Sequence, residues 1–217
     1  MKTKATSTLR TVCLAFFFVA TSLTSVHAVP ILLNGSFESP VISPNTDVSG
    51  GGDFWTGNSG AFIVANNFNS FGTTPYGNQY LGLEGGTDQQ SVAGFLAGQN
   101  YVLDLFFADA AGQPNPTLSV TLSGVASGVS TFTAPVTGPN GNNPYPFLEE
   151  KVFFTPSANG SVTFLLADSG SVLAIDNLSL QQISNGVPDP GSSALLLGLG
   201  IVGLVGVQRA LGVQRRI

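Results

Sequence analysis

The middle of the chain shows short alternations of apolar and polar residues and no long helical period. Apolar residues alternate with Ser and Thr over 117–123 and again over 161–167. This period of two is typical of a strand with one buried face. Segment 101–107 is apolar on both parities apart from Asp104, which predicts a strand in the centre of a sheet.

The same criteria predict ten strands between residues 29 and 182, separated by Gly, Asn, Pro and Ser. They cover residues 31–37, 61–65, 79–84, 89–95, 101–108, 117–123, 129–133, 147–154, 161–167 and 171–180. Many short strands at regular spacing, with turn signals between them, are typical of a sandwich or barrel. A doubled sheet covers strand edges, as in jelly rolls. The expected fold is therefore an all-β jelly-roll β-sandwich.

The N-terminus has the pattern of a secretory signal peptide. Basic residues up to Arg10 precede the apolar run 12–20, and residues 26–28 (Val-His-Ala) offer a cleavage site between small residues. We therefore assign 1–28 to a signal peptide and expect the mature, exported chain to begin near Val29.

The C-terminus has the pattern of a short membrane tether. An apolar run over 192–207 is followed by Arg209, Arg215 and Arg216. A spanning helix needs about 20 apolar residues, and about 17 at the least, so the run needs residues beyond Arg209, whose side chain then snorkels. We predict a transmembrane helix and basic tail over 192–217, with the C-terminus in the cytoplasm because the arginines follow the helix.

Residues 183–191 form a linker that ends in the turn Val187-Pro188-Asp189-Pro190. Turn, apolar helix and terminal arginines together resemble the PEP-CTERM sorting signal, and in particular its VPDSG variant. Asp189 stands where the common form has Glu, and Pro190 where the variant has Ser. The resemblance implies an exosortase-like partner, an inner-membrane intermediate, and a final place on the surface or in the matrix of a Gram-negative bacterium. An ordinary tail anchor is the alternative.

Removing the signal peptide changes the composition in a way that excludes several chemistries. The chain's single Cys and single His, Cys13 and His27, both leave with it. The mature domain can then build neither a Ser-His-Asp nor a Cys-His site, and it lacks the usual zinc ligands. Residues 29–186 contain eleven acidic residues and one base, Lys151. Nucleic acid is excluded as a partner, since its binding requires clustered Lys and Arg.

Three segments carry a second resemblance: 34–38 (Asn-Gly-Ser-Phe-Glu), 95–101 and 174–180 (Ala-Ile-Asp-Asn-Leu-Ser-Leu). In this order they resemble the galactose-binding-like jelly roll of family 4 and 9 carbohydrate-binding modules. The resemblance implies carbohydrate binding without catalysis. It also implies a structural Ca²⁺ site that includes Glu38 and Asp176.

The residues themselves also favour calcium. Asp176 has the parity of Leu178 and Leu180, so its carboxylate is expected on the face that buries leucines. A buried carboxylate needs compensation, and Lys151 alone cannot serve every acid. Calcium accepts carboxylate and carbonyl oxygens. Alternatively, Asp176 caps a turn and Glu38 is solvated.

The candidate ligand-binding residues are loop aromatics, namely Trp55, Tyr76, Tyr80, Tyr145 and Phe147. Sugars stack on such rings. A lone Trp in a sandwich is more often part of the core, whereas Tyr145 lies between two prolines and is expected to be exposed.

We therefore predict an exported, non-catalytic protein with polysaccharide as its ligand. A structural matrix protein without a specific ligand is an alternative. A glycoside hydrolase, which needs two carboxyl groups across a cleft, is a further one.

Overall fold

The computed structural model describes residues 29–68, 73–109, 116–134, 147–170, 172–183 and 197–198. The chain divides into two units, and every strand belongs to the unit Ala28–Ile183. The predicted signal peptide 1–28, the sorting turn 187–190 and Tyr145 lie outside the described residues, as does all of 192–217 except Leu197 and Gly198. Among the described residues, no helix is long and apolar enough to cross a membrane.

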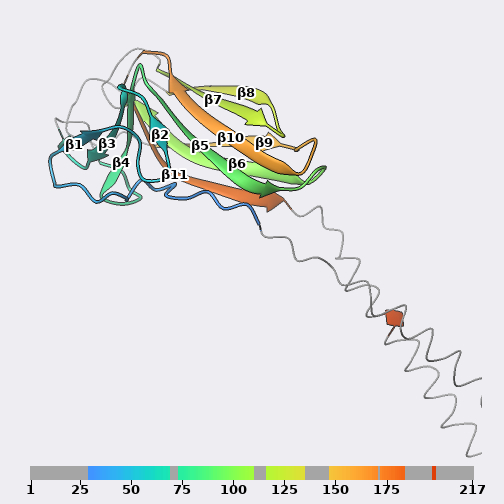
Figure 1. Ribbon diagram of the computed structural model, residues 1–217. Helices are drawn as coiled ribbons and strands as arrows, with labels where there is room; N and C mark the ends of the chain where they lie inside the picture. Colours follow the sequence, from blue (N-terminus) through green and yellow to red (C-terminus); the bar gives the residue numbers. More distant parts are fainter. Residues whose placement is uncertain are drawn as a thin grey trace, which may run out of the picture. The chain divides into compact units, whose positions relative to one another are not determined.

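Eleven strands are found among the described residues, and they form two antiparallel sheets (Figure 1). In chain order they are β1 (Asp47–Ser49), β2 (Thr56–Gly57), β3 (Ala61–Ala65), β4 (Gln79–Glu84), β5 (Thr87–Phe95), β6 (Asn100–Asp109), β7 (Thr117–Gly124), β8 (Gly128–Thr133), β9 (Leu148–Phe154), β10 (Gly160–Asp168) and β11 (Val172–Ile183). Sheet A has the order β1-β3-β4-β11-β6-β9, and sheet B the order β2-β5-β10-β7-β8. From β4 to β7 the chain changes sheet at every connection, which is the interleaving expected of a jelly roll.

The core lies between the two sheets. Fully buried side chains from both sheets meet there: Leu103, Leu105 and Phe107 of β6, Leu118 of β7 and Phe164 of β10. On β7 and β10 the buried residues alternate with less buried ones, as the sequence period predicted. The all-β sandwich prediction is confirmed.

Nine of the ten predicted strands are present with both ends within three residues of the prediction. The prediction for 31–37 was wrong, because Asn34 and Phe37 have positive φ angles of 49° and 53°, which a strand does not accommodate. The sequence also missed β1 and β2, which are three and two residues long and carry no readable period.

Side chains from the sheets replace the missing strand hydrogen bonds of this opening segment. The amide group of Gln90 accepts from Leu33 N at 2.9 Å and donates to Leu33 O at 2.8 Å. Gln79 Nε2 donates to Phe37 O at 2.6 Å. The segment is also bonded to the closing strand, since Leu178 N donates to Gly35 O at 2.8 Å. The first and last parts of the domain are therefore directly joined.

Candidate functional site

A β-bulge in β11 decides the position of Asp176. Asp176 lies opposite Phe106 of β6, whereas Ser179 lies opposite Asp104, so β11 has one extra residue here. Asn177, with a φ of 51°, accommodates the extra residue. The bulge reverses the side-chain alternation, so that Leu178 enters the core.

Asp176 accordingly lies on the outer face of sheet A, the face turned away from sheet B. It shares that face with Ala174, while Leu173 and Ile175 belong to the core. The sequence argument that Asp176 faces the leucines was therefore wrong, because it assumed a regular strand. The residue is nevertheless fully buried.

Loop residues cover Asp176 from outside. The Thr74 hydroxyl donates to Asp176 Oδ2, and Asn177 N donates to Oδ1 at 2.6 Å. Burial raises the pKa of Asp176 to about 7, with a smaller contribution from the nearby charge of Glu38. Thr74 is itself held in place, because its N donates to Asn66 Oδ1 at 3.0 Å.

Glu38 reaches the same loop from the opening segment. Its Oε1 accepts hydrogen bonds from Asn78 N at 2.7 Å and Gln79 N at 3.1 Å. Gly77 leaves the necessary space, since a Cβ there would lie 1.9 Å from Glu38 Oε1. Glu38 and Asp176, predicted together from the sequence, thus meet at one loop.

The donors at this loop fit a hard cation. Two carboxylates and the Thr74 hydroxyl offer oxygen ligands, the type that calcium prefers. The single base of the described domain is bound elsewhere, with Lys151 Nζ 2.7 Å from Asp104 Oδ1. Within the described ranges no three acidic, His or Cys side chains form a metal group. An ion here would therefore depend on backbone carbonyls as well.

The outer face of sheet A also carries an aromatic platform formed by Tyr76, Phe106 and Phe147. The ring centroids of Tyr76 and Phe106 are 4.5 Å apart, and those of Tyr76 and Phe147 are 6.1 Å apart. Tyr76 N donates to Thr74 Oγ1 at 3.1 Å, so the platform is bonded to the group that covers Asp176. Burial, together with the charges of Glu149 and Asp176, raises the pKa of Tyr76.

The other candidate aromatics have different positions. Trp55 is 7% exposed, packs against Phe37 with the ring centroids 5.4 Å apart, and donates from Nε1 to Leu33 O at 3.1 Å. It belongs to the core, as its lone occurrence suggested, and does not line the outer face. Tyr80 is 1% exposed and lies in a cluster of buried side chains with Val64 and Ala174. Phe147 was a candidate and is part of the platform. Phe106 was not a candidate, because a strand that is apolar on both parities does not reveal which ring remains accessible.

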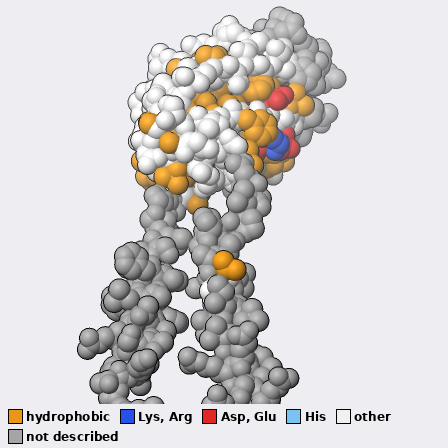
Figure 2. All heavy atoms as spheres, turned by 90° about the vertical axis from the view of Figure 1, so that its right-hand side faces the viewer, with side chains coloured by type: hydrophobic (Ala, Val, Ile, Leu, Met, Phe, Trp, Pro, Cys, Tyr) orange, Lys and Arg blue, Asp and Glu red, His pale blue; other side chains and the backbone are white. Residues whose placement is uncertain are grey.

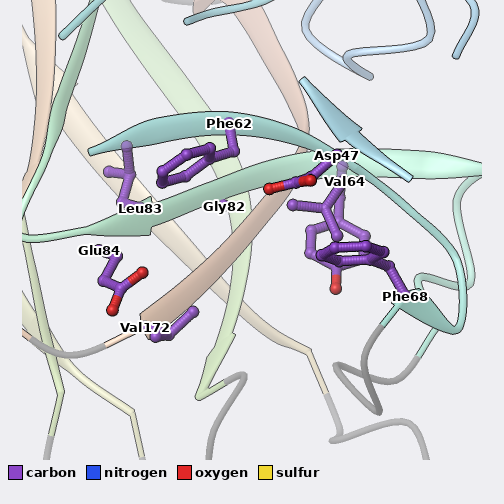
Figure 3. A pocket seen from close by; sticks show the side chains of 9 residues that line it. Asp47, Phe62, Val64, Phe68, Gly82, Leu83, Glu84 and Val172 are labelled. Carbon is purple, nitrogen blue, oxygen red and sulfur yellow. The ribbon is translucent and has the colours of Figure 1, made fainter. Parts of the chain in front are cut away.

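A pocket lies beside the platform on the same face. It is lined by residues of β1, β3, β4 and β11 and of the loop after β3: Asp47, Phe62, Val64, Phe68, Tyr80, Gly82, Leu83, Glu84 and Val172 (Figure 3). Phe62, Phe68, Val172 and the platform residue Phe147 pack against one cluster of buried side chains, Val64, Tyr80 and Ala174. Pocket and platform are therefore parts of one apolar surface. The side of the domain that faces right in Figure 1 also exposes hydrophobic side chains among few charged ones (Figure 2).

No protein-family profile matches the chain, and no curated protein matches it. Several solved structures are similar in arrangement. TmCBM61 in complex with β-1,4-galactotriose aligns with a TM-score of 0.48 at 13% identity, covering 72% of this chain and 100% of that one. The CBM22-1 xylan-binding domain of Paenibacillus barcinonensis Xyn10C gives 0.45 at 10%, covering 66% and 97%.

The C-terminal family 22 carbohydrate-binding module of Clostridium thermocellum Xyn10B gives a TM-score of 0.44 at 15% identity, covering 75% of this chain and 97% of that one. Carbohydrate-binding modules are therefore among the solved structures similar to this chain. Similarity at this level assigns no ligand, which has to come from the chain's own residues.

Proposed function

We propose that this is an exported, non-catalytic protein that binds polysaccharide on the outer face of sheet A. The observation that carries the proposal is the aromatic platform, continuous with a pocket on the same apolar surface. Pyranose rings present C–H faces that pack on aromatic rings. Ligand sites commonly combine such apolar walls with a few polar groups. Here Asp47 and Glu84 supply those groups.

A calcium ion bound by Glu38 and Asp176 is part of the proposal. Supporting it are the burial of Asp176, the oxygen donors around the loop, and the absence of a basic partner for this carboxylate among the described residues. The ion would neutralise the two acids. Thr74 and Tyr76 are bonded to each other beside Asp176, so the same ion would steady the platform's tyrosine.

Export and sorting complete the proposal, and their support comes from the sequence. Signal peptide 1–28, the turn Val187-Pro188-Asp189-Pro190 and the transmembrane helix would deliver the protein through an exosortase-like enzyme to the surface or matrix. Changing Asp189 and both prolines to Ala should leave the protein in the inner membrane. Normal sorting of that variant would contradict the signal interpretation.

The test of ligand binding is a glycan array probed with the full chain and with Tyr76→Ala. Tyr76 is half-exposed, so its loss should weaken binding while the fold persists. Tyr145→Ala extends the test to the second candidate ring. If no glycan is retained, the structural-matrix alternative replaces this proposal. If a retained glycan is cleaved, the hydrolase alternative does.

A further inference from the structure

The pocket beside the platform combines an aromatic wall with two acidic side chains. Its walls include the rings of Phe62 and Phe68, yet two exposed carboxylates, Asp47 and Glu84, also line it (Figure 3). They come from different strands, β1 and β4, which both pair with β3. Asp47 pairs with Val64, and Val64 pairs with Tyr80, four residues before Glu84, so the two acids lie at opposite ends of the pocket (Figure 3).

No base of the described domain neutralises these acids. Lys151, its only basic residue, binds Asp104 at 2.7 Å and also pairs with Glu149. The pocket therefore has an uncompensated negative charge beside an apolar wall. A complementary ligand is a cation that also has an apolar face.

Two common polysaccharide classes do not meet this description. A uronic acid polymer carries the same charge as the pocket, and like charges in contact disfavour binding. Calcium would bridge them only with 6–8 oxygen ligands, whereas Phe62, Phe68, Val64 and Val172 line this pocket. A neutral glycan would fit the rings but leave both carboxylates without a charged partner.

We infer that the pocket recognises a polysaccharide with free amino groups, in which a hexosamine ring packs on the phenylalanines, while ammonium groups on different residues of the sugar chain bind Asp47 at one end of the pocket and Glu84 at the other (Figure 3). An ammonium group has three donors and makes charge-assisted hydrogen bonds to carboxylates. This inference rests on the proposed function and names the sugar class for the same surface.

The experiment compares three β-1,4-linked hexamers that share one backbone and differ only at C2. These are the hexamer of glucosamine, with free amines, the hexamer of N-acetylglucosamine, and cellohexaose. Binding is measured by calorimetry with the full chain, in a detergent without a sugar head group, at a pH where the amines are protonated. Hexagalacturonate, with and without calcium, is the anionic arm.

The glucosamine hexamer should bind at least about fivefold more tightly than the other two, since an exposed charge pair contributes up to about 1 kcal/mol. D47N/E84Q should remove this preference, so that the glucosamine hexamer binds no more tightly than the other two. D53N/E150Q removes the same number of charges at positions that do not line the pocket, and should keep the preference. Raising the salt to 1 M, where the screening length falls to about 3 Å, should reduce it.

Equal binding of the three hexamers, or a preference that survives D47N/E84Q, would overturn the inference and leave polysaccharide binding standing. Preference for hexagalacturonate in calcium would overturn it in favour of an acidic polymer. If a hexamer is hydrolysed, and either single variant, Asp47→Asn or Glu84→Gln, abolishes the hydrolysis, the two acids would be assigned to catalysis instead. If no hexamer and no array glycan binds, the proposed function itself fails.

Discussion

Asp88 provides the sharpest test of how this acid-rich domain depends on pH. It lies on β5 with its side chain fully buried, and Gln89 N donates to Oδ1 at 2.9 Å. Its Oδ2 has no hydrogen-bond partner among the described residues. Gly51 lies so close that an added Cβ would be 2.5 Å from both carboxylate oxygens. Burial raises the pKa of Asp88 from 3.8 to about 7.

The sign of the pH dependence follows from the pH at which each state, folded or unfolded, releases the proton of Asp88. Between pH 4 and pH 7 the unfolded chain ionises Asp88 while the folded chain retains the proton, so stability falls as the pH rises. Each pH unit corresponds to 1.36 kcal/mol. Because burial raises the pKa of Asp88 from 3.8 to about 7, the folded state is at most about 4 kcal/mol less stable at neutral pH than at pH 4 on account of this group.

The measurement is urea unfolding at pH 4 to 8 in the presence of chelator, followed by the fluorescence of Trp55, the only tryptophan. Asp88→Asn should flatten the pH profile relative to wild type. The quantity to compare is the slope of the free energy of unfolding against pH, and not its absolute value. The new amide N–H₂ group carries a burial cost of about 1–3 kcal/mol at every pH, which shifts the whole profile without changing its slope. Asp53→Asn, at an exposed position, should keep the wild-type slope. An Asp88→Asn profile as steep as that of wild type would refute the reasoning.

Three further outcomes are expected. Trp55→Ala should lower the free energy of unfolding by about 3–5 kcal/mol, measured by urea unfolding followed by circular dichroism; a change below 1 kcal/mol would contradict its place in the core. Gly35→Ala should destabilise by about 1–3 kcal/mol in the same assay, since its Cβ would lie 2.1 Å from Leu178 O; an unchanged midpoint would contradict this contact. Calcium at a hundredfold excess over Kd should stabilise the metal-free protein by about 2.7 kcal/mol. In thermal melts, Asp176→Asn should lose this response and Asp47→Asn should keep it. A melting temperature of the metal-free protein that does not change on adding calcium would exclude the ion.

Most of the sandwich could be predicted because its strands carry their own signal. Alternation over 117–123 and 161–167 places one parity in the core, and β7 and β10 follow it. The opening segment carried no comparable signal. It is apolar enough to resemble a strand, but side chains far away in the sequence, Gln79 and Gln90, supply its hydrogen bonds.

The candidate site was predictable in its residue types and not in its geometry. Glu38 and Asp176 do meet at one loop, as the resemblance implied. Thr74, which bonds Asp176, is a loop threonine without any distinguishing pattern. The place of Asp47 in the pocket was unpredictable for another reason, since β1 is too short to show which face its residues take.

A single irregularity in β11 connects the stability of the fold with its outer surface. Without the bulge at Asn177, Asp176 and Leu178 would share a face, and one of them would be in the wrong environment. With it, Leu178 enters the core, and its N–H bonds Gly35 of the opening segment. Asp176 turns outward, beneath Thr74 and next to the platform. The residue that joins the two ends of the domain and the residue that underlies the proposed binding surface are thus positioned by the same backbone feature, which explains why a regular strand could not serve both.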